Sequence, residues 1–351
     1  MTTARSTVLT FVAAGLMTLT TAVVLGAETS SVLTFEWTKS TPFPESRAGY
    51  AAGVIHGKLV IAGGTYWEGT KGHWTKKLFC ATTHAFDPRT KTWDKLPDAP
   101  IPFGYAAYTV VNNKLFVLGG FTGSQVNRKI YILEKTADRY VWSAYGDMPA
   151  DRVFAGAVSV GRTIHLLGGS TQFEPYDAAG TCCTTKTVTD SFMALDTAHP
   201  ERGWRQLPPF PGPRRSLSAI ETDGKSIWMF GGSFQLEQKD PITTFNEVVR
   251  YQLAEGKWET MPPLPDAARE AMPLSPFLVK DKIILVGGAK NVWQLDLKTL
   301  KYSELSPLPE AAFVDKFVWL DNMAIGAGGE NSIEGPRRRS EWTFIGRVAT
   351  K

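Results

Sequence analysis

Arginine recurs at four corresponding places in this chain, each time shortly before an apolar segment that ends in a tight turn. The four residues are Arg47, Arg152, Arg215 and Arg269. A guanidinium presents a planar fork of donors that matches a carboxylate, so several of them around one opening would bind an anionic or hydroxyl-rich ligand. The same groups could instead cap strands or pair with acids inside the fold. The sequence leaves both interpretations open.

Three long segments combine aromatic with polar side chains, and each follows a pair of glycines. They are residues 65–83, 170–190 and 233–245. An aromatic face beside polar groups suits a sugar ring, and exposed aromatics equally suit a protein partner. We expect Trp67, in the first of these segments, to contribute to substrate binding.

The glycine pairs belong to a repeat. Six apolar segments end in Gly-Gly, and the second glycines are Gly64, Gly120, Gly169, Gly232, Gly288 and Gly329. The successive spacings between them are 56, 49, 63, 56 and 41 residues. A period of about 50 residues indicates an array of supersecondary units rather than unrelated turns.

Each unit reads as four strands. The first strand is apolar and leads through a tight turn into the second strand, which ends in the glycine pair. A third strand follows the loop after the glycines, and the fourth strand carries an aromatic residue and then a proline. The last unit lacks a fourth strand after Trp342, whereas the segment around Trp37 precedes the first unit and fits that pattern. We therefore expect the Trp37 segment to pair with the strand at Trp342 and close a ring without long exposed edges.

Over about residues 34–348 the chain resembles a six-bladed kelch β-propeller. The resemblance implies an all-β fold closed by the N-terminal strand, with residues 28–351 as a single domain. Strand direction alternates within a blade, so the loops after the glycine pairs and the segments before the first strands should surround one mouth. The fourth-strand aromatics should act as wedges between blades, and they are Trp37, Trp93, Trp142, Trp204, Trp258 and Tyr302.

The first 27 residues have the order of a secretory signal. Met1–Arg5 carries a positive charge, Val8–Leu25 is apolar and uncharged, and Gly26-Ala27 precedes Glu28. We expect cleavage after Ala27 and export, most simply to a periplasm. An uncleaved anchor is the alternative, because 18 residues can just span a bilayer.

Charge and cysteine content narrow the possible partners. The net charge is +4 and no basic stripe with interleaved aromatics occurs, so we expect no nucleic-acid partner. The five histidines and three cysteines show no metal-ligand spacing, so we expect no metal site and no cofactor. Cys80 and the Cys182-Cys183 pair fall in loops of one face of the expected ring, and export favours a disulfide from Cys80 to one of them.

The loop of the last unit resembles one in a group of exported bacterial kelch proteins, the N-acetylneuraminate (sialic acid) mutarotases or epimerases. Gly329-Glu330 is followed by the segment 334–338, Glu-Gly-Pro-Arg-Arg. The resemblance implies that Glu330 is the acid/base and that Arg337 or Arg338 binds the substrate carboxylate. It also implies an isomerase that needs no nucleophile, metal or cofactor.

A second interpretation stays open. The same aromatic loops could make the protein a non-catalytic module that binds a glycan or another protein, because a fold alone does not define an activity. In either case we expect a ligand at the mouth of the central channel, a small sugar or a protein partner, and no membrane association after signal cleavage.

Overall fold

The computed structural model describes residues 32–70, 73–173, 187–235, 240–270, 273–331 and 338–349. The chain divides into two compact units, Met1–Ser31 and Val32–Lys351, and all described residues belong to the second. The expected signal peptide therefore lies outside the described residues, and its cleavage stays a prediction. Within the described ranges, no helix is long and apolar enough to cross a membrane.

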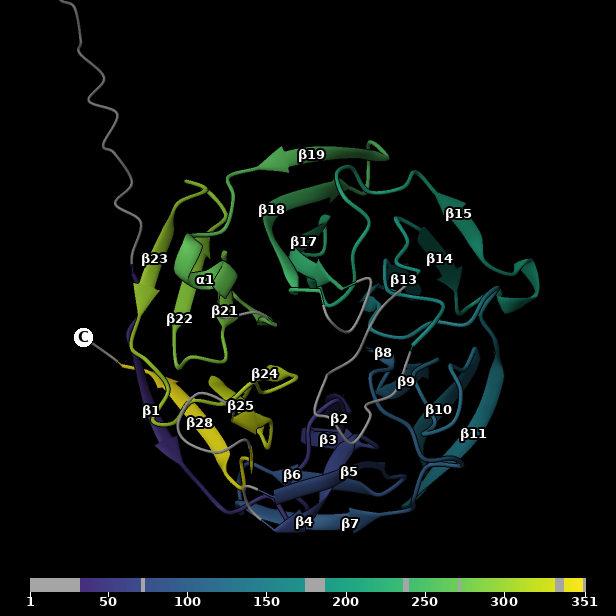
Figure 1. Cartoon of the computed structure of the whole chain (residues 1–351), viewed down its shortest axis with the longest axis vertical. Coiled ribbons are helices and arrows are strands. Elements are labelled where there is room, and N and C mark those ends of the chain that lie inside the picture. Colours follow the sequence, from purple (N-terminus) through teal and green to yellow (C-terminus); the bar gives the residue numbers. More distant parts are fainter. Residues whose placement is uncertain are drawn as a thin grey trace, which may run out of the picture. The chain divides into compact units, whose positions relative to one another are not determined.

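Six four-stranded antiparallel sheets are arranged radially as the blades of a propeller (Figure 1). The first three blades, each from inner to outer strand, are β2 (Ala51–Ile55), β3 (Lys58–Ala62), β6 (Thr83–Asp87) and β7 (Thr92–Leu96); β8 (Ala107–Val111), β9 (Lys114–Leu118), β10 (Lys129–Thr136) and β11 (Arg139–Asp147); β12 (Gly156–Val160), β13 (Thr163–Leu167), β14 (Phe192–Asp196) and β15 (Arg205–Leu207).

The remaining blades follow the same plan. They are β16 (Ala219–Thr222), β17 (Ser226–Phe234), β18 (Thr243–Gln252) and β19 (Lys257–Met261); β20 (Ser275–Val279), β21 (Lys282–Val286), β22 (Val292–Asp296) and β23 (Tyr302–Leu305); β24 (Phe317–Leu320), β25 (Met323–Ala327), β28 (Thr343–Val348) and β1 (Phe35–Lys39). The predicted all-β propeller with six blades is confirmed. The described helices are short: η1 (Pro200–Arg202) and α1 (Asp266–Glu270).

The N-terminal strand closes the ring. β1 pairs antiparallel with β28, and Trp37 lies opposite Gly346 in this ladder. A Cβ at Gly346 would approach the Trp37 ring to 2.5 Å, so glycine makes room for the indole. The predicted closure by the Trp37 segment is therefore confirmed, and the sixth blade gains its outer strand.

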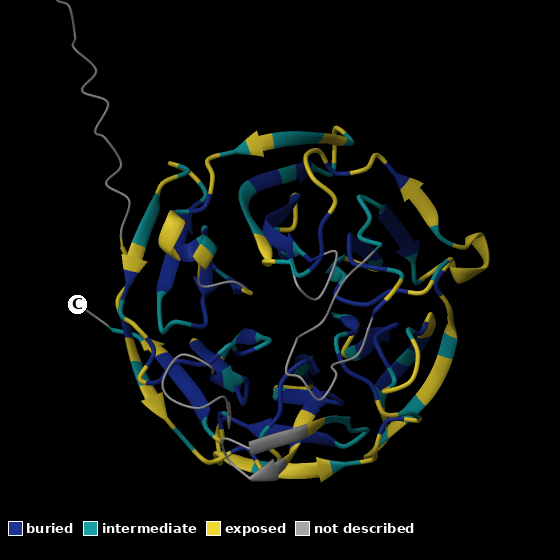
Figure 2. Ribbon diagram, in the orientation of Figure 1, coloured by how far each residue is buried: buried dark blue, intermediate teal, exposed yellow. Residues whose placement is uncertain are grey.

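The fourth-strand aromatics join each blade to the preceding one. The indole of Trp142 donates to Pro97 O, that of Trp258 to Pro208 O, and that of Trp37 to Ser306 O, at 2.9–3.0 Å. The tyrosine that replaces tryptophan in the fifth blade keeps this bond, because Tyr302 Oη donates to Pro262 O. Buried apolar clusters fill the junctions behind these rings, while the outermost strands are exposed (Figure 2).

The glycine pairs allow close contact between neighbouring blades. Gly119 and Gly328 have φ values of 71° and 69°, a region that disfavours side chains with a Cβ. A Cβ at Gly119 would lie 2.5 Å from Arg152 O, and one at Gly328 would lie 2.7 Å from Arg47 O. Backbone of the next blade occupies the space that a side chain would need.

Two extra hairpins rise after the second strands of the first and sixth blades. β4 (Thr65–Thr70) pairs with β5 (His73–Phe79), and β26 (Glu330–Asn331) pairs with β27 (Arg338–Arg339). Both hairpins begin directly after a glycine pair, so their first residues lie beside the segments that lead into the inner strands. This places them at one mouth of the central channel.

Candidate functional site

A chain of backbone hydrogen bonds runs from blade to blade around this mouth. Tyr105 N donates to Gly49 O at 2.7 Å, Phe154 N to Tyr105 O at 2.9 Å, and Leu217 N to Phe154 O at 3.0 Å. All four residues are left-handed, with φ between 54° and 68°. This conformation costs a residue with a Cβ about 1–2 kcal/mol, so only Gly49 adopts it freely.

Asp315 of the sixth blade lies at one end of this series of hydrogen bonds. Its Oδ2 accepts the hydrogen bond of Gly49 N at 2.8 Å, where the three junctions described above use a backbone carbonyl. A carboxylate thus replaces a neutral acceptor at the rim of the channel. The repeat pattern in the sequence gives no sign of Asp315, because nothing in the pattern distinguishes it from other acids in loops.

The mouth contains a cavity of about 270 Å³ to which all six blades contribute. One lining residue from each blade is Gly49, Tyr105, Phe154, Leu217, Pro273 and Phe313. Asp315, Glu330, Arg339 and Lys77 add charge to the same cavity. Two further cavities, of about 120 and 320 Å³, have Asp315 in their walls as well, and the larger one is lined by all six inner strands.

Glu330 occupies a position that recurs in five described blades. In each of these blades, the residue after the two glycines forms an isolated antiparallel bridge with the segment before the inner strand. The bridges are Ala48–Thr65, Gly104–Phe121, Val153–Ser170, Ser216–Ser233 and Phe313–Glu330. Among these five, Glu330 alone is charged. The backbone of the repeat thus presents a carboxylate at the mouth in the sixth blade and neutral side chains in the others.

Arg339 is the partner of Glu330. The Arg339 Nη1 group forms an ion pair with Glu330 Oε2, and Nη2 donates to Thr65 Oγ1 at 2.8 Å. The Arg339 side chain is only 5% exposed, against 20% for Glu330. The guanidinium therefore neutralises the acid and ties the sixth blade to the first.

The ladder between β26 and β27 explains which arginine of the run meets the acid. Glu330 lies opposite Arg339, and Asn331 lies opposite Arg338. The side chain of Arg338 and all of Arg337 lie outside the described residues, and their predicted role stays a prediction.

Asp315 has an unusual protonation equilibrium for an acid. Removal from bulk water inside the channel raises the pKa of Asp315 to about 7, and the nearby Glu330 carboxylate raises it further. The Gly49 N–H and the Arg339 guanidinium act in the opposite direction. Near neutral pH this carboxyl exists in both protonation states, which suits a group that gives and takes protons.

Lys77 brings a second cation to the cavity from β5. Its Nζ donates to Tyr105 Oη at 2.8 Å and lies 4.8 Å from the centroid of the Trp67 ring. Trp67 is 7% exposed and also has the Arg339 guanidinium 5.9 Å from its centroid. The Trp67 ring therefore packs against both cations. Trp67 lines none of the three cavities described above.

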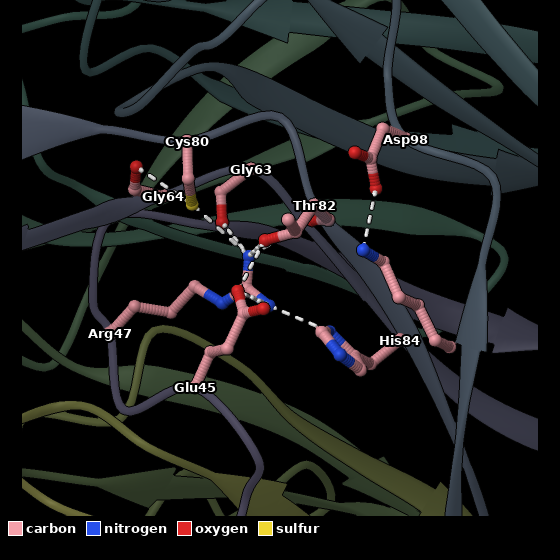
Figure 3. A network of polar contacts seen from close by, with 9 residues as sticks. Glu45, Arg47, Gly63, Gly64, Cys80, Thr82, His84 and Asp98 are labelled. Atoms are coloured by element: carbon pink, nitrogen blue, oxygen red, sulfur yellow. Dashed lines mark hydrogen bonds and ion pairs between the residues drawn. The ribbon is translucent and has the colours of Figure 1, made fainter.

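Arg47 is a structural residue. It is 1% exposed, and Nη1 donates to Gly63 O and Thr82 O, both at 2.9 Å, while Nη2 lies 2.8 Å from His84 Nδ1 (Figure 3). Burial, and then the adjacent Arg47, lowers the pKa of His84, so the neutral ring accepts this bond. The guanidinium joins strands of the first blade and does not line the mouth cavity.

The other predicted arginines also lie away from the cavity. Arg152 and Arg215 are 5% and 0% exposed, and burial lowers the pKa of both. Arg269 lies in α1 and pairs with Asp266 and Glu270 of the same helix at 3.7 Å. None of the four lines a cavity described above, which corrects the expectation that they face the mouth.

Arg215 differs from Arg47 although it precedes the inner strand in the same way. Its guanidinium lies 5.3 Å from the Phe210 centroid and 5.7 Å from the Phe245 centroid. Within the described part of the chain, no acceptor reaches any of its three side-chain nitrogens. The fourth blade holds this charge by contact with aromatic rings instead of carbonyl oxygens.

Among the described residues, Cys80 is a free thiol. Arg47 Nη1 donates to its Sγ at 3.1 Å, and the Sγ lies 3.5 Å from Gly64 O, which explains its polar contacts inside the first blade. Its predicted partners, Cys182 and Cys183, lie outside the described residues. Among the described residues, no group of His, Cys, Asp and Glu is arranged to hold a metal ion.

Comparison with known proteins agrees with this architecture. Residues 80–288 match the KLHDC2/KLHL20/DRC7 Kelch-repeats domain, and residues 46–100 match the Kelch motif. The first match covers more than half of the chain. The protein belongs to the family of kelch-repeat propellers.

The relatives with established names are distant. The kelch-like protein terF of Aspergillus terreus is 24% identical over 276 residues, which are 74% of this chain and 53% of that protein. Beta-scruin of Limulus polyphemus is 24% identical over 217 residues, 61% of this chain and 22% of that protein. The chain thus spans about half or less of the length of these relatives.

One enzyme is among the matches. The N-acetylneuraminate epimerase of Vibrio cholerae is 36% identical over 72 residues, 20% of this chain and 19% of the enzyme. A match of this length shows a shared repeat. The activity that its name describes comes to this chain only as a proposal.

Proposed function

We propose that the mouth binds a small acidic sugar of the sialic-acid type and interconverts its anomers by general acid/base catalysis. The observation that carries the proposal is that Glu330 and Asp315 line one cavity together with two cations, Arg339 and Lys77. The short similarity to N-acetylneuraminate epimerase supports the choice of substrate.

The two carboxyl groups have different environments. Glu330 forms an ion pair with the Arg339 guanidinium, whereas removal from bulk water inside the channel raises the pKa of Asp315 to about 7. Such a difference allows one carboxylate to act as a base while its neighbour donates a proton. Interconversion of the anomers requires these two proton transfers, one from the anomeric hydroxyl and one to the ring oxygen.

In the proposed reaction Glu330 removes the proton of the anomeric hydroxyl while Asp315 protonates the ring oxygen. The bond between the anomeric carbon and the ring oxygen breaks, and a carbonyl forms at the anomeric carbon. Rotation of this carbonyl and the reverse proton transfers close the ring with the hydroxyl on the other face. The step needs no nucleophile, and proton transfer by placed side chains contributes about 10²–10⁴-fold.

The substrate carboxylate needs a cation beyond the one that pairs with Glu330. Arg337 or Arg338 keeps this role in the proposal, because both follow Glu330 closely in the sequence. Lys77 is a further candidate, since it lines the same cavity from the first blade. A flexible ammonium group at this place can follow a ligand carboxylate.

The test is to follow the equilibration of freshly released N-acetylneuraminate anomers by NMR. We expect acceleration by the wild-type protein and a loss of about 100-fold or more in Glu330→Gln and in Asp315→Asn. Glu341→Gln, a substitution at an exposed acid, is the control and should behave as wild type. No acceleration by the wild type would remove the mutarotase proposal, and full activity of Glu330→Gln would remove that residue's role.

A non-catalytic binding module is the second candidate. Ile242 is 59% exposed at the edge of the cavity, beside Phe234, and exposed apolar residues of this kind mark binding surfaces. This function would be favoured if the wild type has no mutarotase activity and if the substitution Ile242→Asp releases a bound partner protein.

Export also stays a proposal, and N-terminal sequencing of the secreted protein would test cleavage after Ala27.

A further inference from the structure

We propose that the mouth selects acids that carry an apolar group, and that Tyr105, Phe154 and Leu217 are the residues that determine this specificity. The inference rests on the proposed function only in taking the mouth as the ligand site. It does not depend on the anomer reaction or on the identity of the sugar.

The backbone conformation of these three residues supports the proposal. Each is left-handed, with φ of 59°, 54° and 55°, at the position where the first blade has Gly49 with φ of 68°. The hydrogen bonds from blade to blade use backbone atoms alone, so glycine would satisfy them with less strain. Large side chains held in such a conformation point to a role for the side chains themselves.

The side chains of these three residues form one surface. All three line the mouth cavity, and the rings of Tyr105 and Phe154 have centroids 4.5 Å apart with an interplanar angle of 36°. Leu217 follows Phe154 in the hydrogen-bonded chain. We call Tyr105, Phe154 and Leu217 the apolar wall.

A cluster of phenylalanine rings packs against the apolar wall and holds it in place. Phe173 lies 5.9 Å from the Tyr105 ring and 5.5 Å from the Phe154 ring, and Phe121 lies 4.7 Å from Phe173. This small cluster is separate from the cores between the blades. A wall that is already in place before a ligand arrives loses little conformational entropy on binding.

Charge defines the other side of the cavity. Lys77 donates to the hydroxyl of Tyr105, so a cation stands where the apolar wall meets the polar side. Arg339, Glu330 and Asp315 complete that side. The polar side has two cations and two carboxyl groups, and burial raises the pKa of one of these carboxyls, Asp315, to about 7. This side therefore attracts an anion, whose apolar part then meets the wall.

The test is a series of unbranched carboxylates from butanoate to decanoate, measured by calorimetry with the full chain. The acid group is constant, so the change in Kd along the series reports how much apolar surface the site removes from water. We expect Kd to fall about two- to threefold for each added methylene, which is less than full burial gives. These probes have no anomeric centre, so binding is measured independently of mutarotation.

Substitution by asparagine, which tolerates the left-handed conformation, tests the wall itself. In Leu217→Asn and Phe154→Asn the dependence of Kd on chain length should weaken to less than 1.5-fold for each methylene. Leu300→Asn is the matched control, because Leu300 is also left-handed, with φ of 56°, and lies in the turn between β22 and β23. It should keep the wild-type dependence.

Three results would overturn the proposal. They are no binding of decanoate, a Kd that does not change with chain length, or an unchanged dependence in both wall variants. Failure of the mutarotase assay alone would leave the proposal intact, because a non-catalytic mouth can still select amphiphilic acids. Loss of carboxylate binding in Lys77→Met with an unchanged fold would support the assignment of the polar side.

Discussion

Two sides of one mouth share a backbone and differ in chemistry. The side made by the sixth and first blades carries Glu330, Arg339, Asp315 and Lys77, whereas the side made by the third and fourth blades carries Phe154 and Leu217. The backbone bridges are the same, since Phe313–Glu330 corresponds to Ser216–Ser233. A ring of equivalent positions therefore lets single substitutions place charge on one side without changing the scaffold.

The comparison extends to the buried arginines. The Nη1 and Nη2 groups of Arg47 bond to carbonyl oxygens and to His84, whereas Arg215 lies among aromatic rings. Both are almost completely buried. The same residue type at the same place in the repeat thus has strong hydrogen bonds in the first blade and none among the described residues in the fourth.

The largest predicted effect is on the free energy of unfolding, when Arg47 and Arg215 are each replaced by an apolar residue. Arg47→Met removes the donor of two buried carbonyl oxygens and should lower the free energy of unfolding by about 4 kcal/mol. Arg215→Met removes a buried charge that lacks hydrogen bonds and should cost about 1 kcal/mol or less. Urea unfolding of both variants measures the difference, and equal losses would contradict the distinction between the two blades.

A smaller effect should follow the charge on Asp315. The unfolded carboxyl titrates near 3.8 and the folded one near 7, so between these pH values only the folded state holds the proton. Because the folded pKa is raised, this contribution to stability is present at low pH and is lost as the pH rises from about 4 to 7. We expect a loss of about 2 kcal/mol for this half-buried group.

Asp315→Asn sharpens that prediction. The amide oxygen still accepts the Gly49 N–H but does not titrate, so the free energy of unfolding of this variant should be flatter over the same pH interval. Asp321→Asn, at an exposed turn, is the control and should retain the wild-type slope. An Asp315→Asn curve that parallels the wild type would show that another group titrates.

The smallest effect concerns the coupling between Glu330 and Arg339. A double-mutant cycle with Glu330→Gln and Arg339→Met should give a coupling free energy of about 1 kcal/mol, since the acid is partly exposed. In the fourth blade Ser233 stands at the position of Glu330, and its coupling with Ser216, across the bridge that corresponds to Phe313–Glu330, should be smaller. A coupling indistinguishable from zero would mean that the ion pair does not hold the polar side together.

The architecture could be predicted because its signals are local and repeated. Gly119 and Gly328 are required where the next blade's backbone comes within 3 Å of a Cβ, so the glycine pairs mark every blade. Trp37 was predictable as a wedge because the aromatic–proline pattern identifies a fourth strand wherever it occurs in the chain. These features depend on covalent geometry and side-chain volume, which the residue type alone specifies.

The site was predictable only in part. Glu330 lies in the mouth cavity as the repeat suggested, but Arg47, Arg152 and Arg215 turn into the blades. Whether an arginine faces a channel or a carbonyl depends on the rotamer and on neighbours far away in sequence. No repeat pattern contains that information.

The sequence by itself determined the number of blades, their strand order and the closure by the Trp37 segment, because spacing and glycine placement are properties of the chain. The tertiary structure alone decided that Arg339 is the partner of Glu330, that Asp315 replaces a carbonyl at the rim, and that Tyr105, Phe154 and Leu217 share one wall. The physical reason is that these contacts join different blades, and their energies depend on distances and burial that exist only once the ring has closed.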